Sequence, residues 1–118
     1  TADALFDGEL PKGDALAVAR IAGIQAAKRT SDLVPLCHPL AIHGVEVSLR
    51  VDDDAVAIQA TVRTADRTGV EMEALTSVAV AALALIDMVK AVDPAAVMTD
   101  VRLDEKTGGR RGHWRRPS

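Results

Sequence analysis

Aromatic residues are nearly absent from this sequence of 118 residues, which contains one Phe, one Trp and no Tyr. The core must therefore be aliphatic, built from Ala, Val, Leu and Ile. Small apolar side chains also leave surface that another subunit can cover. The lack of aromatics argues against an RNA-binding sheet, because such sheets stack bases on exposed aromatic side chains. We therefore expect no nucleic-acid partner.

Cysteine is equally scarce, since Cys37 is the only one. No internal disulfide can form, and a reducing compartment fits, so we expect a cytoplasmic location. No uninterrupted apolar run is long enough to span a bilayer, and no signal peptide is visible, so we expect no membrane partner. The length suits one domain over residues 1–118. The first residue is Thr1, and we expect the N-terminal segment to be incomplete.

The stretch Gly69–Asp93 predicts the helix around which the rest of the chain is arranged. Helix formers dominate it, and neither Pro nor Gly follows Gly69 within it. Thr68 or Gly69 can cap its start, and Pro94 ends it by favouring an extended conformation at the residue before it. Residues 78–86 are apolar on all sides, which predicts that both faces of the helix are buried.

A second helix is predicted from Asp14, which serves as its N-cap, to about Ala27. Its small residues lie on one narrow face. Gly23 costs about 1 kcal/mol relative to Ala in a helix interior, so we expect another element to pack closely there.

Two stretches alternate apolar and polar residues, Val45–Val51 and Ala55–Arg63, around an acidic turn at 52–54. They predict an antiparallel hairpin with one solvated face. A further strand is predicted at Val97–Leu103, and a short one near Ala4–Phe6. The order of elements is typical of an α+β fold, an antiparallel sheet with two main helices packed on one face. With the strand near the N-terminus, the fold is ferredoxin-like.

The first candidate for chemistry is the loop Leu33–Leu40, where two prolines flank Cys37 and His38. The prolines exclude a helix interior and a central strand, so the loop is stiff. Adjacent residues of an extended chain point to opposite sides, which makes this pair a poor chelator, and we expect no metal site. A rigid histidine can act as a donor or an acid–base group. A loop histidine that only satisfies its own hydrogen bonds is an equal alternative.

The second candidate is the pair Asp87 and Lys90, which share a helix face at spacing i, i+3. An ordinary helix ion pair worth roughly 0.2–0.5 kcal/mol is one interpretation, and an acid–base pair at the mouth of a site is the other. A third group consists of cations on loops or helix ends near glycines, which suits phosphate binding, although solvated loops carry such charges too. Its members are Lys12, Lys28, Lys106, Arg110 and Arg111.

Several stretches together carry a family resemblance. They are Ala19–Ile24, Ala27–Thr30, Leu36–Pro39, Arg67–Thr76, Asp87–Val92, Val101–Leu103 and Glu105–Gly109. In this order they closely resemble cyclic pyranopterin monophosphate synthase, the molybdenum cofactor biosynthesis protein C family. The resemblance covers nearly the whole chain from Lys12 onwards. It is specific because several motifs occur in the right order, whereas any one of them would be weak.

The resemblance implies a ferredoxin-like fold in a homohexamer, a trimer of dimers, with the site at a subunit interface. It implies a lyase whose small-molecule substrate is a cyclised dihydro-GTP. The family rearranges this substrate to cyclic pyranopterin monophosphate and releases pyrophosphate. The sequence requires no cofactor, and it leaves open whether Mg²⁺ accompanies the triphosphate.

The family's functional positions carry over to this chain residue by residue. Its catalytic Asp maps onto Asp87, and its catalytic lysines map onto Lys90 and Lys12. These groups suit proton transfer. The substrate-binding and pocket positions map onto Leu36, Cys37, His38, Met72, Glu73, Glu71, Lys28 and Lys106, and Arg110 stands where the family often has Lys.

A rival from another class is a non-catalytic ferredoxin-like module that binds nucleotides or RNA as an oligomer. Such a module has no use for an acid–base pair. A loss of function when Asp87 or Lys90 is replaced by a neutral residue would therefore favour the synthase over the binding module.

Overall fold

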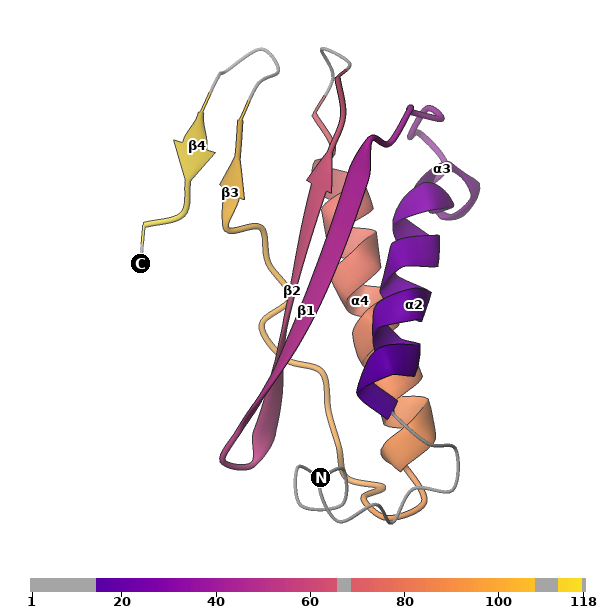
Figure 1. Cartoon of the computed structure of the whole chain (residues 1–118), viewed down its shortest axis with the longest axis vertical. Helices are drawn as coiled ribbons and strands as arrows, with labels where there is room; N and C mark the ends of the chain where they lie inside the picture. The colour runs from indigo at the N-terminus through magenta and orange to yellow at the C-terminus, as the bar shows by residue number, and fades with distance from the viewer. Residues whose placement is uncertain (1–14, 66–68, 108–112, 118) are drawn as a thin grey trace.

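The computed structural model describes residues 15–65, 69–107 and 113–117 (Figure 1). Its elements follow in the order α2 (Ala15–Lys28), α3 (Thr30–Leu33), β1 (Gly44–Asp52), β2 (Ala55–Arg63), α4 (Glu71–Val89), β3 (Glu105–Lys106) and β4 (Trp114–Arg115). The two long strands form an antiparallel sheet, and α2 and α4 pack side by side on one of its faces (Figure 1). The α+β class and the layer of helices on one face are confirmed.

The hairpin agrees with the prediction from alternation. Its register runs from Gly44 opposite Arg63 to Asp52 opposite Ala55. Along β2, exposed and half-buried residues alternate without a break. In β1, Val47 is buried on the helix side while its neighbours Glu46 and Ser48 are exposed. The sheet therefore has one apolar face under the helices and one solvated face, as period-2 patterning predicts.

The first long helix begins at Ala15 and ends at Lys28, one residue beyond the predicted end. Asp14, its predicted cap, lies outside the described residues. Gly23 is buried against α4, and a Cβ atom built on it would lie 3.1 Å from the Ser77 carbonyl oxygen and 3.2 Å from the Ala81 Cβ. The expected close packing at Gly23 is confirmed, because an added Cβ would make tighter contacts than most Cβ atoms make and α4 would have to shift slightly.

We expect Gly23→Val to lower the free energy of unfolding by about 1–3 kcal/mol, since its side chain must push the two helices apart. The matched control is Gln25→Val, an exposed position of the same helix, where the change should stay within about 0.5 kcal/mol. Urea denaturation of both variants measures the difference. Equal stabilities would show that the helix contact relaxes without cost.

The central helix α4 is shorter than predicted, and its cap differs. Its N-cap is Val70, without a side-chain hydrogen bond, so the assignment of the cap to Gly69 was wrong, while Thr68 lies outside the described residues. The helix ends at Val89. A hydrogen bond of 2.8 Å from the Asp93 amide to the Val89 carbonyl then closes a turn before Pro94.

The prediction that both faces of α4 are buried was wrong for this chain. The buried residues form one stripe with a spacing of four, namely Glu73, Ser77, Ala81, Leu85 and Val89. Leu83, on another side of the helix, is 59% exposed. The reason is that α2 and the hairpin cover only one side of α4, whereas composition reports how apolar a segment is and not what covers it.

The expectation about membrane-spanning segments also needs correction. By length and composition alone, α4 could cross a membrane, with 19 residues and a mean hydropathy of 1.8. A count of consecutive apolar residues underestimates the length of the apolar segment in α4, because Thr76 and Ser77 interrupt the run without adding charge. In this structure, α4 is the helix that packs along α2 and the hairpin.

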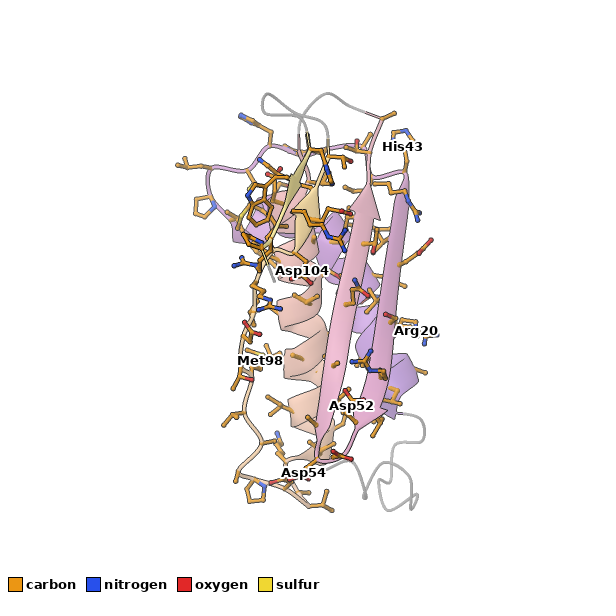
Figure 2. All side chains as sticks on the ribbon, turned by 90° about the vertical axis from the view of Figure 1, so that its left-hand side faces the viewer. Arg20, His43, Asp52, Asp54, Met98 and Asp104 are labelled. Atoms are coloured by element: carbon orange, nitrogen blue, oxygen red, sulfur yellow. The ribbon has the colours of Figure 1, made fainter. Side chains whose placement is uncertain are left out.

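The predicted strand at Val97–Leu103 was wrong, since no strand is found in residues 96–104. Asp100 has a φ of 55°, a left-handed conformation that interrupts an extended run. Arg102 then binds both Asp100, at 3.3 Å, and Asp104, at 3.2 Å. Figure 2 shows this segment beside α4.

Strand pairing after α4 begins further along the chain than predicted. It joins β3 to β4 in a separate antiparallel sheet of two strands. The strand predicted near Ala4–Phe6 lies outside the described residues.

Candidate functional site

The two groups of charged residues on α4 stand at its opposite ends. Glu71 and Glu73 lie in the first turn, while Asp87 lies in the last turn and Lys90 follows the helix. At a rise of about 1.5 Å per residue, Glu73 and Lys90 are roughly 25 Å apart. Within one chain, the helix therefore places these groups in two separate regions.

At the C-terminal end, the Lys90 ammonium donates a hydrogen bond of 2.7 Å to Asp87 Oδ1. The two side chains are 65% and 63% exposed, so their attraction adds little to stability. The pair nevertheless places two groups that can exchange protons with a ligand side by side at the surface. Lys12, the third predicted catalytic residue, lies outside the described residues.

At the N-terminal end, three predicted site residues line one hollow. Glu73 is only 4% exposed, and it lines the hollow together with Lys28, from the end of α2, and His38, from the proline-flanked loop. These residues come from three separate segments of the sequence. The hollow thus combines a carboxylate, an ammonium and an imidazole, which can bind the polar edge of a heterocycle.

The hollow is small, with a volume of about 50 Å³. That is room for a few water molecules, whereas sites for drug-sized ligands usually measure about 300–1,000 Å³. The hollow is therefore too small to hold a drug-sized ligand by itself.

A further contact brings β3 to the N-terminal end of α4. The Lys106 ammonium lies 3.6 Å from Glu71 Oε1, and each side chain is about one third exposed, at 33% and 32%. The Glu71 carboxylate lies over Gly69, where an added Cβ would collide with it. That carboxylate is the end of a flexible side chain and can move aside, so the contact alone does not require a glycine at position 69.

The structure does not bring all the predicted binding residues to the hollow. Leu36 is 93% exposed and Met72 is 40% exposed, and neither lines it. Cys37 is half-buried with a free thiol, and its amide donates to the Val34 carbonyl at 3.0 Å. Arg110 lies outside the described residues.

Several residues of the hollow were missed from the sequence, namely Ala27, Thr30, Ser31, Pro39, Leu40 and Ile42. Thr30 shows why: its hydroxyl lies 3.2 and 3.1 Å from the carbonyl oxygens of Ala26 and Ala27 and donates to them, at the end of α2. Such backbone contacts leave no signature in composition or spacing. The only available signal was adjacency to Lys28 and His38.

The described ranges contain no group of three or more His, Cys, Asp and Glu side chains placed to hold a metal ion. The His38 loop contributes to the hollow without such a cluster.

Comparison with known proteins gives consistent results. The model of the MoaC family matches residues 1–109. The chain is 70% identical over 113 residues to a cyclic pyranopterin monophosphate synthase of Streptomyces avermitilis, covering 95% of this chain and 66% of that protein. It is 71% identical to the synthase of Streptomyces griseus, with 95% and 64% covered, and 67% identical to that of a Nocardioides species, with 96% and 72% covered. The chain thus spans about two thirds of the length of these relatives.

Proposed function

Because the chain belongs to the MoaC family, we propose that it acts as a cyclic pyranopterin monophosphate synthase in molybdenum cofactor biosynthesis. It converts a cyclised dihydro-GTP to cyclic pyranopterin monophosphate and releases pyrophosphate. The relatives that are about 70% identical carry this name. The structural observation that supports the proposal is the hydrogen bond between Lys90 and Asp87 at the surface, since the rearrangement needs groups that exchange protons.

In this proposal, Asp87 and Lys90 transfer protons to and from the substrate, and Lys12 is the third catalytic group. The Asp87 carboxylate holds the Lys90 ammonium in place at 2.7 Å. A lysine suits this role because its ammonium can release a proton, which an arginine cannot do.

The substrate is bound at the N-terminal end of α4. Glu73 accepts hydrogen bonds from the guanine-like edge of the substrate, with Lys28 and His38 in the same hollow. Lys106 and Arg110 stabilise the negative charge of the triphosphate and of the leaving pyrophosphate. Leu36, Cys37 and Met72 complete the binding surface in the assembled protein.

The proposal includes an assembly, because one chain provides only part of the site. We propose a single ferredoxin-like domain in a homohexamer, a trimer of dimers, that works in the cytoplasm on a small-molecule substrate without nucleic acid or membrane. Support comes from the small volume of the hollow, about 50 Å³, and from the exposed apolar side chains of α2 and α4, such as Ile21 at 55% and Leu83 at 59%. Large apolar side chains left exposed on these helices are available for another subunit to cover. The proposal invokes no resident cofactor and leaves open whether Mg²⁺ accompanies the triphosphate.

The proposal is tested by incubating the purified protein with the cyclised dihydro-GTP that the preceding radical enzyme makes. Formation of pyrophosphate and of the cyclic phosphate, detected by mass spectrometry, supports the synthase. Tight binding of the substrate without either product supports instead a non-catalytic nucleotide-binding module. Binding of single-stranded RNA in place of the substrate would favour the RNA-binding module.

We expect the affinity for nucleoside triphosphate analogues to fall as salt rises, because ions screen the cations around the triphosphate. Lys106→Ala should weaken binding about tenfold, since hydrogen bonds to charged groups contribute roughly 1.5–3 kcal/mol. Arg115→Ala, an exposed cation on the neighbouring strand β4, is the matched control and should bind as the wild type does. Isothermal titration calorimetry at several salt concentrations measures both. If both variants lose the same affinity for the triphosphate analogue, the weaker binding reflects the net charge of the protein and not a contact made by Lys106.

A further inference from the structure

Three hydrogen bonds join the two chain segments beyond the end of the β1–β2 ladder. The His43 amide donates to the Arg63 carbonyl at 2.8 Å. The Thr64 hydroxyl donates to the Ala41 carbonyl at 2.6 Å, and the Ala65 amide donates to Nδ1 of His43 at 3.0 Å. Figure 2 shows His43 at the end of the hairpin far from Asp52 and Asp54. Side chains therefore continue the pairing where the strands have ended.

The chemistry of the His43 contact is specific. Because Nδ1 accepts the Ala65 amide proton, this nitrogen carries no proton of its own, and the neutral ring carries its proton on Nε2. An asparagine can place its side-chain oxygen where Nδ1 stands, whereas a leucine of similar size offers no acceptor. The contact can therefore be removed or preserved by substitution.

The contact lies next to one wall of the hollow. His38, Pro39, Leu40 and Ile42 line it, and His43 follows directly. Residues 38–43 have no helix or strand of their own, so few backbone hydrogen bonds hold this wall in place. The contacts at 41–43 tie its far end to the hairpin.

The other partner, Ala65, lies between the end of β2 and the start of α4, and the first turn of α4 carries Glu73, which also lines the hollow. The hydrogen bond between Ala65 and His43 thus connects two segments of the chain. One of them contains the loop that lines the hollow, and the other leads from the hairpin towards α4. The sequence alone does not single out His43, because a lone histidine before a strand has no distinguishing pattern.

We propose that His43 is a positioning residue of the nucleotide site: its Nδ1 holds the 38–42 wall against the hairpin and so sets the position of His38 relative to Glu73. The effect on substrate rests on the proposed function, whereas the hydrogen bond to Ala65 does not. His43 acts through its neighbours and touches neither the substrate nor the Asp87–Lys90 pair.

The test compares His43→Leu with His43→Asn in the full protein, using the cyclised dihydro-GTP as substrate. His43→Leu should raise KM about fivefold, the effect expected for losing one hydrogen bond, and leave kcat within about twofold, because the proton-transfer groups are elsewhere. His43→Asn keeps an acceptor and should stay within about twofold of the wild type in both constants.

Hydrogen exchange of the Ala65 amide gives a readout that needs no activity. It should be faster in His43→Leu and as slow in His43→Asn as in the wild type. Unchanged exchange in His43→Leu, or a His43→Asn variant as impaired as His43→Leu, would overturn the proposal. If the wild type forms no product at all, the proposed function fails, and the exchange comparison alone decides whether His43 holds the wall.

Discussion

Lys90→Ala and Asp87→Asn should each lower turnover at least about 100-fold, because a positioned acid or base typically contributes 10²–10⁴-fold to a rate. Both residues are more than 60% exposed and their mutual hydrogen bond lies at the surface, so neither substitution removes core packing. The circular dichroism spectrum and the oligomeric state should therefore stay unchanged. Steady-state production of pyrophosphate measures the effect.

Lys90→Arg refines this prediction. An arginine keeps the positive charge and can still bind the Asp87 carboxylate, but it stays protonated and cannot act as a base. We expect Lys90→Arg to lose nearly as much turnover as Lys90→Ala. Retention of turnover in Lys90→Arg would assign to Lys90 an electrostatic role and no proton transfer.

The matched control is another exposed ion pair, in which Arg50 lies 3.2 Å from Asp52 at the end of the hairpin. Arg50→Ala removes a surface ion pair of the same kind and should leave turnover within about twofold, since such pairs contribute little to stability. If either Asp87→Asn or Lys90→Ala behaves like Arg50→Ala, the acid–base assignment is wrong.

Co-expression of Glu73→Ala with Lys90→Ala, each inactive alone, should restore activity to roughly a quarter of the wild type. The reason is the length of α4, which separates Glu73 from Lys90 by roughly 25 Å at 1.5 Å per residue. If both groups belong to one pocket, the simplest arrangement takes them from different subunits of a two-fold dimer. Random pairing makes about half of the dimers mixed, and each mixed dimer has one intact pocket of two.

The control for this experiment is co-expression of Lys90→Ala with a differently tagged Lys90→Ala, which should restore nothing. Because Glu73 is buried, Glu73→Gln repeats the experiment with a side chain of the same size. Mass spectrometry confirms that mixed dimers form. If they form and remain inactive, then either one subunit supplies both groups or Glu73 lies outside the site.

Local patterns in the sequence were sufficient to predict α2, the hairpin and the close contact at Gly23. The alternation in β2 and the bounds of α2 agree with the structure to within a residue or two. Each of these features depends on neighbours that are close in sequence, such as the period of apolar residues or the absence of a Cβ atom. The pairing of Lys90 with Asp87 was likewise readable from their spacing on one helix.

The assembly of the candidate site was decided by the tertiary structure alone. Lys28, His38 and Glu73 meet in one hollow, and Lys106 reaches Glu71, although these residues are far apart in sequence. No local period encodes such contacts, because they depend on how α2, the proline-flanked loop and α4 are arranged. The family resemblance selected these residues without showing which of them touch.

The sequence by itself thus determined the two long helices and the hairpin, and the resemblance chose the residues proposed for function. The tertiary structure decided that Val97–Leu103 does not form a strand and that α4 is covered on one side only. Both outcomes depend on a partner elsewhere in the fold. A strand needs a neighbouring edge with which to exchange hydrogen bonds, and a buried face needs another element to cover it. Apolar composition supplies neither partner, and the fold alone determines where the partners lie.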